Sequence, residues 1–141
     1  EVDIRAHLIK QSKIQNRLVE ELVVECVERY VESLSVYKKY NIPIIVWGPI
    51  ASWCDQKVYT GGPSFGTNLE RNLITKAFNT TLELCCIKHQ FEFITIFPEM
   101  LNDDGTTNGD FLDDWEGSHM HLSQRSMPTI LQNFKSAGLI K

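Results

Sequence analysis

Features that mark several common protein classes are missing from this sequence of 141 residues. No apolar stretch approaches the roughly 20 residues that a membrane-spanning helix needs. The basic residues form no run, and fourteen Lys and Arg against eighteen Asp and Glu give a formal charge of −4. This balance disfavours a protein that binds nucleic acid through charge. We therefore expect neither a membrane span nor a nucleic-acid partner.

Motifs for bound metals and nucleotides are also scarce. None of the four cysteines falls in a C-x-x-C or Cys/His spacing, so neither a zinc site nor a redox pair is predicted. The glycines of residues 61–66 resemble a phosphate-binding loop, but Thr67 stands where such a loop has lysine. Residues 103–110 resemble a calcium loop, but Trp115 stands where a bidentate glutamate is needed. We expect no metal and no cofactor.

The chain does contain an alternation of helical and strand patterns. Apolar residues recur at helical spacing over residues 14–37 and 67–89, which predicts two amphipathic helices. Short apolar runs at 42–47 and 91–97 are typical of buried strands. A last helix is expected over 125–137. In the helix of 67–89, the inward-facing residues are expected to include Leu69, Leu73, Phe78 and Leu82.

This order predicts an α/β fold, a three-layer α/β/α sandwich whose parallel sheet is joined by right-handed crossovers. The strands at 42–47 and 91–97 should be parallel neighbours. Residues 1–4 read like the end of another strand, so we expect residues 1–141 to form a single domain whose N-terminal part is missing. Because ligands bind beyond the carboxyl ends of such strands, we expect the functional site there.

A histidine-rich segment follows an acidic loop just before the last predicted helix. His119 and His121 stand close to Asp114 and Glu116 in the sequence. A histidine that is held through one ring nitrogen can act as a general base with the other. Two assignments of the general base are open. It is His119, with Glu116 three residues before it, or His121, with Ser118 three residues before it.

Taken in order, these segments resemble the SGNH (GDSL-type) hydrolase superfamily. The run R-N-L-I-T-K-A-F-N from Arg71, the strand at 91–97, Asp103-Asp104-Gly105 and His121-Leu122-Ser123 are similar to that family's stretch from its last crossover to its D-x-x-H-L motif. The run Trp47-Gly48-Pro49 resembles the exit of its fourth strand. The similarity covers nearly the whole chain and lies in the order and spacing of the segments. It implies a flavodoxin-like fold.

The resemblance also implies a serine ester hydrolase or acyl transferase with a Ser–His–Asp triad. Such enzymes carry the serine in a G-D-S motif, which this chain lacks, so we expect the serine to be supplied upstream of it. Ser118 stands where the family has its acid, and Val2 stands where it has an oxyanion asparagine. His121 is then the general base, with Asp114 or Glu116 as its acid partner, or with no acid in a Ser–His dyad.

Substrate contacts are expected from residues close to the strand ends. Asp3, Arg5 and His7 are candidate substrate-binding residues. Arg5 and His7 suit replacement of the missing oxyanion donor or binding of an anionic substrate group, and they equally fit a surface salt-bridge cluster. Trp53 suits stacking on a sugar or acyl chain, or ordinary packing in its loop. The expected partners are a small-molecule or carbohydrate ester and an N-terminal segment of the same protein. The alternative is a non-catalytic SGNH-like module that binds carbohydrate or protein.

Overall fold

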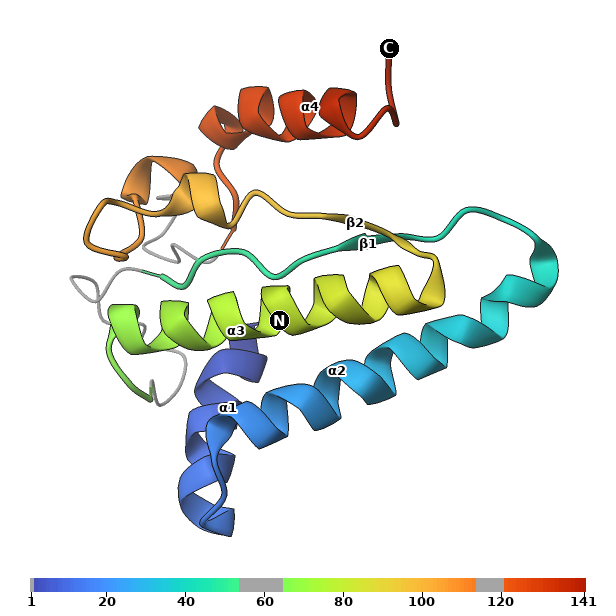
Figure 1. Cartoon of the computed structure of the whole chain (residues 1–141). Helices are drawn as coiled ribbons and strands as arrows, with labels where there is room; N and C mark the ends of the chain where they lie inside the picture. Colours follow the sequence, from blue (N-terminus) through green and yellow to red (C-terminus); the bar gives the residue numbers. More distant parts are fainter. Residues whose placement is uncertain (1, 54–64, 114–120) are drawn as a thin grey trace.

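The computed structural model describes residues 2–53, 65–113 and 121–141 (Figure 1). Its helices and strands alternate after an N-terminal helical pair. In chain order they are α1 (Val2–Gln15), α2 (Val19–Ser35), β1 (Ile45–Trp47), α3 (Asn68–His89), β2 (Glu92–Ile94) and α4 (Met127–Ser136). Short 3-10 turns follow α2 and precede α4, at Val36–Tyr40 and Gln124–Ser126.

The two strands lie next to each other and run parallel. Ile45 is paired with Glu92, Val46 with Phe93, and Trp47 with Ile94. The connection between them contains α3, as in a β–α–β unit (Figure 1). The prediction that the strands within 42–47 and 91–97 are parallel neighbours is therefore confirmed, although each strand is shorter than predicted, at three residues. In the described part of the chain the sheet has these two strands.

The two faces of β1 contact different helices. Successive side chains of a strand point to opposite faces of the sheet. Val46 is buried in one apolar cluster with residues of α2 and α3, among them Val27 and Phe78. Trp47 points the other way and stacks on Phe134 of α4, with 5.9 Å between the ring centroids. Helices α2 and α3 thus pack against one face of the strands, and α4 packs against the other (Figure 1).

The expected helix over residues 14–37 is wrong at its start, because two helices meet there. Asn16 has a φ of 49°, which ends α1, and α2 begins at Val19. The amide of Arg17 donates to the carbonyl oxygen of Ser12 over 3.1 Å, and the Ser12 hydroxyl donates to the carbonyl oxygen of Arg17 over 2.6 Å. Asparagine tolerates the left-handed conformation, so the chain turns without glycine or proline.

The expected strand at residues 1–4 is also wrong. The backbone is helical from Val2, so Asp3 and Arg5 stand in α1 and not at the exit of a strand. A helix satisfies its backbone hydrogen bonds within one segment, whereas a strand needs a neighbour to pair with. His7, on the same helix, is exposed to solvent.

The boundaries of the two later helices follow the sequence closely. Thr67 caps α3 with a capping box: its hydroxyl oxygen accepts from the Glu70 amide over 3.2 Å, and the Glu70 carboxylate accepts from the Thr67 amide over 2.7 Å. The hydrogen bond from the Thr67 amide to the Glu70 carboxylate lowers the pKa of that carboxyl. The chain leaves α4 through Gly138, whose φ of +71° favours glycine. The helices predicted at 67–89 and 125–137 are confirmed.

Candidate functional site

The segments that follow the two strands gather at the carboxyl end of the sheet, where α3 and α4 begin (Figure 1). After β1 the chain turns inward, and Ala51, Ser52 and Trp53 are buried. After β2 it forms the loop that carries Thr107, which is also buried. This end of the sheet is where the sequence places the functional site.

A group of buried polar side chains joins these segments, and we call it the strand-end polar cluster. Each member is at most 4% exposed to solvent. Three members come from the first turns of α3 and the other two from the segments after β1 and β2. They are Asn68, Arg71, Asn72, Ser52 and Thr107.

Arg71 is the charged member of the strand-end polar cluster and holds the segment after β1. Its Nε donates to the Ser52 hydroxyl oxygen over 2.5 Å, and its Nη2 donates to the carbonyl oxygen of Trp53 over 3.1 Å. Its Nη1 donates to the carbonyl oxygen of Gly66. The guanidinium carbon lies 4.3 Å from the centre of the Trp53 ring, within the range of a cation–π contact. Arg71 thus binds both sides of the connection between β1 and α3.

The two asparagines link the loop after β1 to the loop after β2. Asn72 accepts from the Ser52 amide over 2.9 Å and donates to the carbonyl oxygen of Gly105 over 3.0 Å. Asn68 accepts from the Thr107 amide over 2.8 Å, and the Thr107 hydroxyl donates to the Ser52 carbonyl oxygen over 2.6 Å. The two loops are therefore held in fixed positions relative to α3, because buried polar groups are costly to leave unpaired.

Gly48, the first residue after β1, lets the backbone pass close to α3. A Cβ atom at this position would lie 2.1 Å from Oδ1 of Asn79 and 2.8 Å from Cζ of Phe93. Asn79 donates to the carbonyl oxygen of Pro49 over 2.9 Å, which fastens the same turn to the helix. Within the described ranges, its Oδ1 is the buried side-chain oxygen that has no hydrogen-bond partner.

His121 lies in the segment that leads into α4, and its side chain is exposed. Its carbonyl oxygen accepts from the Asp113 amide over 2.8 Å, next to an antiparallel bridge between Leu112 and Leu122. The amide of Ser123 donates to the carbonyl oxygen of Phe111 over 2.9 Å. The carbonyl of His121 and the amide of Ser123 are therefore paired with the strand-like segment of Phe111 and Asp113, while His121 itself is exposed.

The other predicted catalytic residues cannot be placed beside His121. Asp114, Glu116, Ser118 and His119 lie outside the described residues. The choice between His119 and His121 as the general base therefore stays a prediction.

The structure places the predicted substrate contacts in different parts of the molecule. Asp3 and Arg5 are placed only as backbone positions of α1, and His7 is exposed on that helix. Trp53 lies at the expected end of the sheet, but its side chain is 7% exposed and is stacked against Arg71. The stacking of Trp53 on a sugar or acyl chain stays a prediction.

The sequence reasoning did not identify the strand-end polar cluster, because it placed Leu69 and Leu73 on the inward face of α3. Both leucines are exposed, at 42% and 58%, whereas Asn68 and Arg71 point inward. A signal was present, since Asn68, Arg71 and Asn72 stand three and four residues apart and share one helix face. Phe78 and Leu82, further along, are buried as expected.

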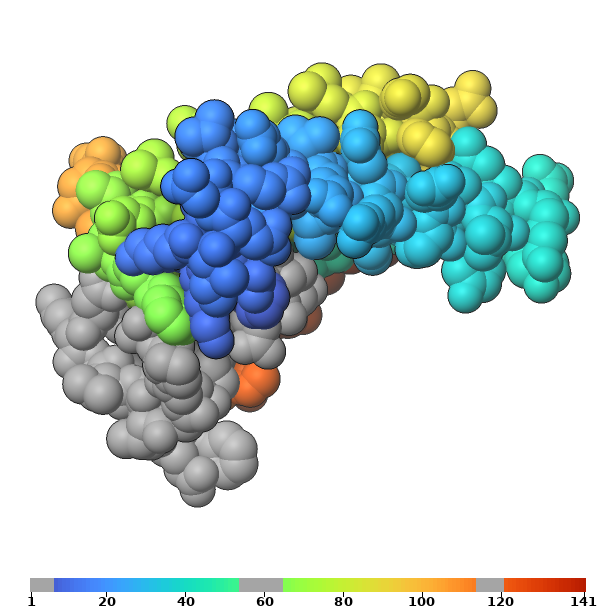
Figure 2. All heavy atoms as spheres, turned by 90° about the horizontal axis from the view of Figure 1, so that it is seen from below, coloured from blue at the N-terminus to red at the C-terminus, as the bar shows by residue number. Residues whose placement is uncertain are grey.

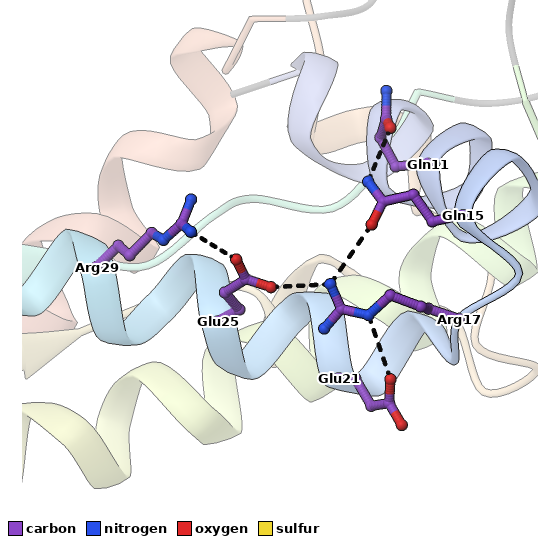
Figure 3. Close-up of polar contacts among 6 residues, drawn as sticks. All are labelled: Gln11, Gln15, Arg17, Glu21, Glu25 and Arg29. Carbon is purple, nitrogen blue, oxygen red and sulfur yellow. Dashed lines mark hydrogen bonds and ion pairs between the residues drawn. The ribbon is translucent and has the colours of Figure 1, made fainter.

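A separate hollow of about 240 Å³ lies between α1 and α2. Glu25 binds Arg17 over 3.0 Å and Arg29 over 2.7 Å at its rim (Figure 3). The hydrogen bond from Arg17 lowers the pKa of Glu25. Glu21 also accepts from Arg17, over 3.4 Å, so two carboxylates balance the two guanidinium groups and leave the hollow with little preference for a charged ligand.

In comparisons with known proteins, no family model, curated protein or solved structure matches the chain. In the described part of the chain, no group of three or more His, Cys, Asp or Glu side chains is arranged to hold a metal ion. No helix in those ranges is long and apolar enough to cross a membrane.

Proposed function

We propose that this chain is part of an SGNH-type serine ester hydrolase or acyl transferase in which His121 is the general base. The observation that carries the proposal is the place of His121: it is exposed, its carbonyl oxygen is paired, and it precedes the helix that begins at the carboxyl end of the parallel strands. Ligands of parallel α/β sheets bind at that end. With helices on both faces of the strands, we further propose a three-layer α/β/α sandwich for the whole domain.

In this mechanism His121 takes the proton from a serine hydroxyl as the serine attacks the ester carbonyl. The alcohol leaves with that proton, and the acyl group then passes to water or to another hydroxyl. Asp114 or Glu116 would orient the imidazole, or the serine and histidine would act as a dyad. The serine would come from residues upstream of Glu1. An acylated carbohydrate is one substrate of the right class.

Two serines of the described chain are close to possible partners but are unsuited to the nucleophile's role. Ser52 is fully buried, and its hydroxyl oxygen accepts from Arg71. Ser35 lies 2.9 Å from Nδ1 of His89, but its hydroxyl donates to the carbonyl oxygen of Val31 over 3.0 Å. A hydroxyl has one proton to donate, so the carbonyl oxygen of Val31 competes with Nδ1 of His89 for the proton of Ser35.

The deciding experiment treats the 141-residue chain and an N-terminally extended protein with a fluorophosphonate probe and maps the labelled serine. We expect labelling upstream of Glu1 and only in the longer protein. In that protein His121→Ala should lower ester turnover by about a hundredfold or more, because general-base catalysis contributes on this order. The matched control, His89→Ala, should leave the turnover almost unchanged.

Other results would contradict the proposal. Labelling at Ser118 in the 141-residue chain would place the nucleophile inside it, and an unchanged turnover in His121→Ala would exclude this histidine as the base. No labelling in either protein would favour the alternative, a non-catalytic SGNH-like module that binds carbohydrate or protein at the same end of the sheet. That alternative is motivated by Ser118, which stands at the position of the family's acid residue.

A further inference from the structure

Helix α3 carries large apolar side chains on the face opposite the one that it buries, and we call them the α3 stripe. The four members are 42% to 66% exposed, and they are Leu69, Leu73, Leu84 and Ile87. Their spacings of four, eleven and three residues keep them on one side of the helix, over a length of about 27 Å. Seen from below, α3 lies beside α2 at the margin of the molecule (Figure 2). A contiguous apolar patch in such a place marks an interaction surface.

Smaller side chains lie at the middle of the α3 stripe. Ala77 is half-buried and Thr80 is exposed, and both stand between Leu73 and Leu84. Side chains of this size let a second helix approach closely, while the leucines on either side provide apolar contact area. The shape of the α3 stripe therefore suits another helix that packs along its length.

Charged residues of both signs follow each flank of the α3 stripe. Because successive residues of a helix are turned by about 100°, Lys76 and Glu83 lie along one flank, and Glu70 and Lys88 lie along the other. All four are exposed. None of them has an opposite charge three or four residues away within α3, the spacings at which charges pair on one helix. Pairing within α3 therefore does not account for these charges.

An antiparallel second copy of α3 would match both the apolar and the charged positions. When two identical surfaces pack about a two-fold axis, residue i contacts residue j of the second copy, and j contacts i. Each flank of an antiparallel helix pair then lies against the same flank of the other helix, in reverse order. With the axis near the middle of α3, Leu73 would contact Leu84 of the second copy. Lys76 would lie beside Glu83 of the second copy, and on the other flank Glu70 would lie beside Lys88 of the second copy.

We propose that the α3 stripe is the interface between two copies of this chain, which pack antiparallel about a two-fold axis. Burial of the leucines and of Ile87 supplies the attraction. The charges on the flanks fix the direction and the register of the two helices, and each ion pair occurs twice by symmetry. The interface uses the outer face of α3, whereas the strand-end polar cluster uses the inner face, so the dimer forms whether or not the site hydrolyses esters.

Sedimentation equilibrium of the 141-residue chain over a range of concentrations tests the pairing. We expect a reversible monomer–dimer equilibrium, and Leu73→Asp should raise the dissociation constant about a hundredfold or more, because it buries a carboxylate against Leu84 of the second copy. The matched control Leu131→Asp changes an exposed leucine of α4 and should leave the constant unchanged. Monomers at every concentration, or equal effects of the two variants, would overturn the proposal. Where the chain is monomeric, Leu84→Ala should unfold like the parent protein, and a loss of stability there would instead assign the α3 stripe to contacts within one chain.

Charge reversals test the direction of the two helices. Lys76→Glu alone and Glu83→Lys alone should each raise the dissociation constant about tenfold, because each reversal places like charges together at two symmetric points. Lys76→Glu combined with Glu83→Lys should restore the constant of the parent protein. The control Lys135→Glu changes an exposed lysine of α4 and should have no effect. A parallel pair would bring the two different flanks together, so a double variant without rescue would contradict the antiparallel interface.

Discussion

Arg71 shows what a single residue can do at the strand ends. Burying a guanidinium costs free energy unless its donors are bound, and this side chain is 1% exposed. Its donors bind Ser52, Trp53 and Gly66, which stand on both sides of the connection between β1 and α3. The charge therefore stabilises one backbone path at the carboxyl end of the sheet.

Replacing this charge should be costly. We expect Arg71→Met to lower the free energy of unfolding by about 3–5 kcal/mol, as when one partner of a buried polar network is removed. Urea denaturation measures the loss. The matched control is Arg125→Ala, which removes an exposed ion pair with Asp110 and should cost less than about 1 kcal/mol. Equal stability losses in the two variants would contradict the role given to Arg71.

Titration of the Cys86 thiol makes the stability of the folded protein depend on pH in the alkaline range. Burial, aided by the nearby Cys85 and Glu83, raises the pKa of its thiol from 9.0 to about 11. The folded protein therefore keeps this proton over a range in which the unfolded chain releases it. The resulting stability is fully present below pH 9 and is lost as the pH rises toward about 11.

We expect this titration to lower the free energy of unfolding by up to about 2 kcal/mol. Urea denaturation at a series of pH values between 8 and 11 measures it, and Cys86→Ala is the control because it cannot titrate. The free energy of unfolding should fall less steeply with pH in Cys86→Ala. Parallel pH profiles of the two proteins would show that Cys86 does not contribute.

Helix α3 is the element that organises the site. Its N-terminal turns present Asn68, Arg71 and Asn72 to the loops, and its later turns present Phe78 and Leu82 to the apolar cluster. One face of α3 therefore contacts the polar loops near its N-terminus and the apolar cluster further along. The orientation of its first turn depends on the capping box of Thr67 and Glu70.

Removal of this cap should be measurable. Thr67→Ala is expected to lower the free energy of unfolding by about 1 kcal/mol, because an amide in the first turn of α3 loses its acceptor. Thr80→Ala is the control, since Thr80 is exposed in the middle of the same helix. It should be neutral or slightly stabilising, because alanine has the higher helix propensity. A Thr67→Ala variant with unchanged stability in thermal unfolding would contradict the capping role.

At the scale of the whole molecule, two apolar clusters lie on opposite faces of the strands. One contains Leu82 with residues of α2 and α3, and the other contains Ile96 with residues near α4. Val46 and Trp47, neighbours in β1, each contact a different one. A two-stranded sheet thus couples both clusters, which favours unfolding as one cooperative unit.

The cooperativity can be tested by weakening each cluster separately. Leu82→Ala and Ile96→Ala remove buried side chains and should each cost about 2–5 kcal/mol. Both should shift the same single unfolding transition, followed by circular dichroism and by tryptophan fluorescence. Leu84→Ala is the control, because this leucine is 63% exposed. Separate transitions for the two variants would show that residues 1–141 are not a single domain.

The sequence by itself determined the strands, their parallel pairing and the boundaries of α3 and α4. These features depend on local signals: an uncharged run ahead of Gly48, a capping box at Thr67, and a glycine after the last helix. Each signal acts within a few residues, so it can be recognised without the rest of the fold.

The tertiary structure alone decided the break at Asn16, the helical state of residues 2–15 and the face that α3 turns inward. Leu69 and Leu73 satisfy a helical pattern, but Arg71 is buried instead, because Ser52 and Trp53 are close enough to bind it. Those partners stand 19 and 18 residues away in the sequence. A local pattern cannot choose between two faces of a helix when the choice depends on hydrogen bonds to distant loops.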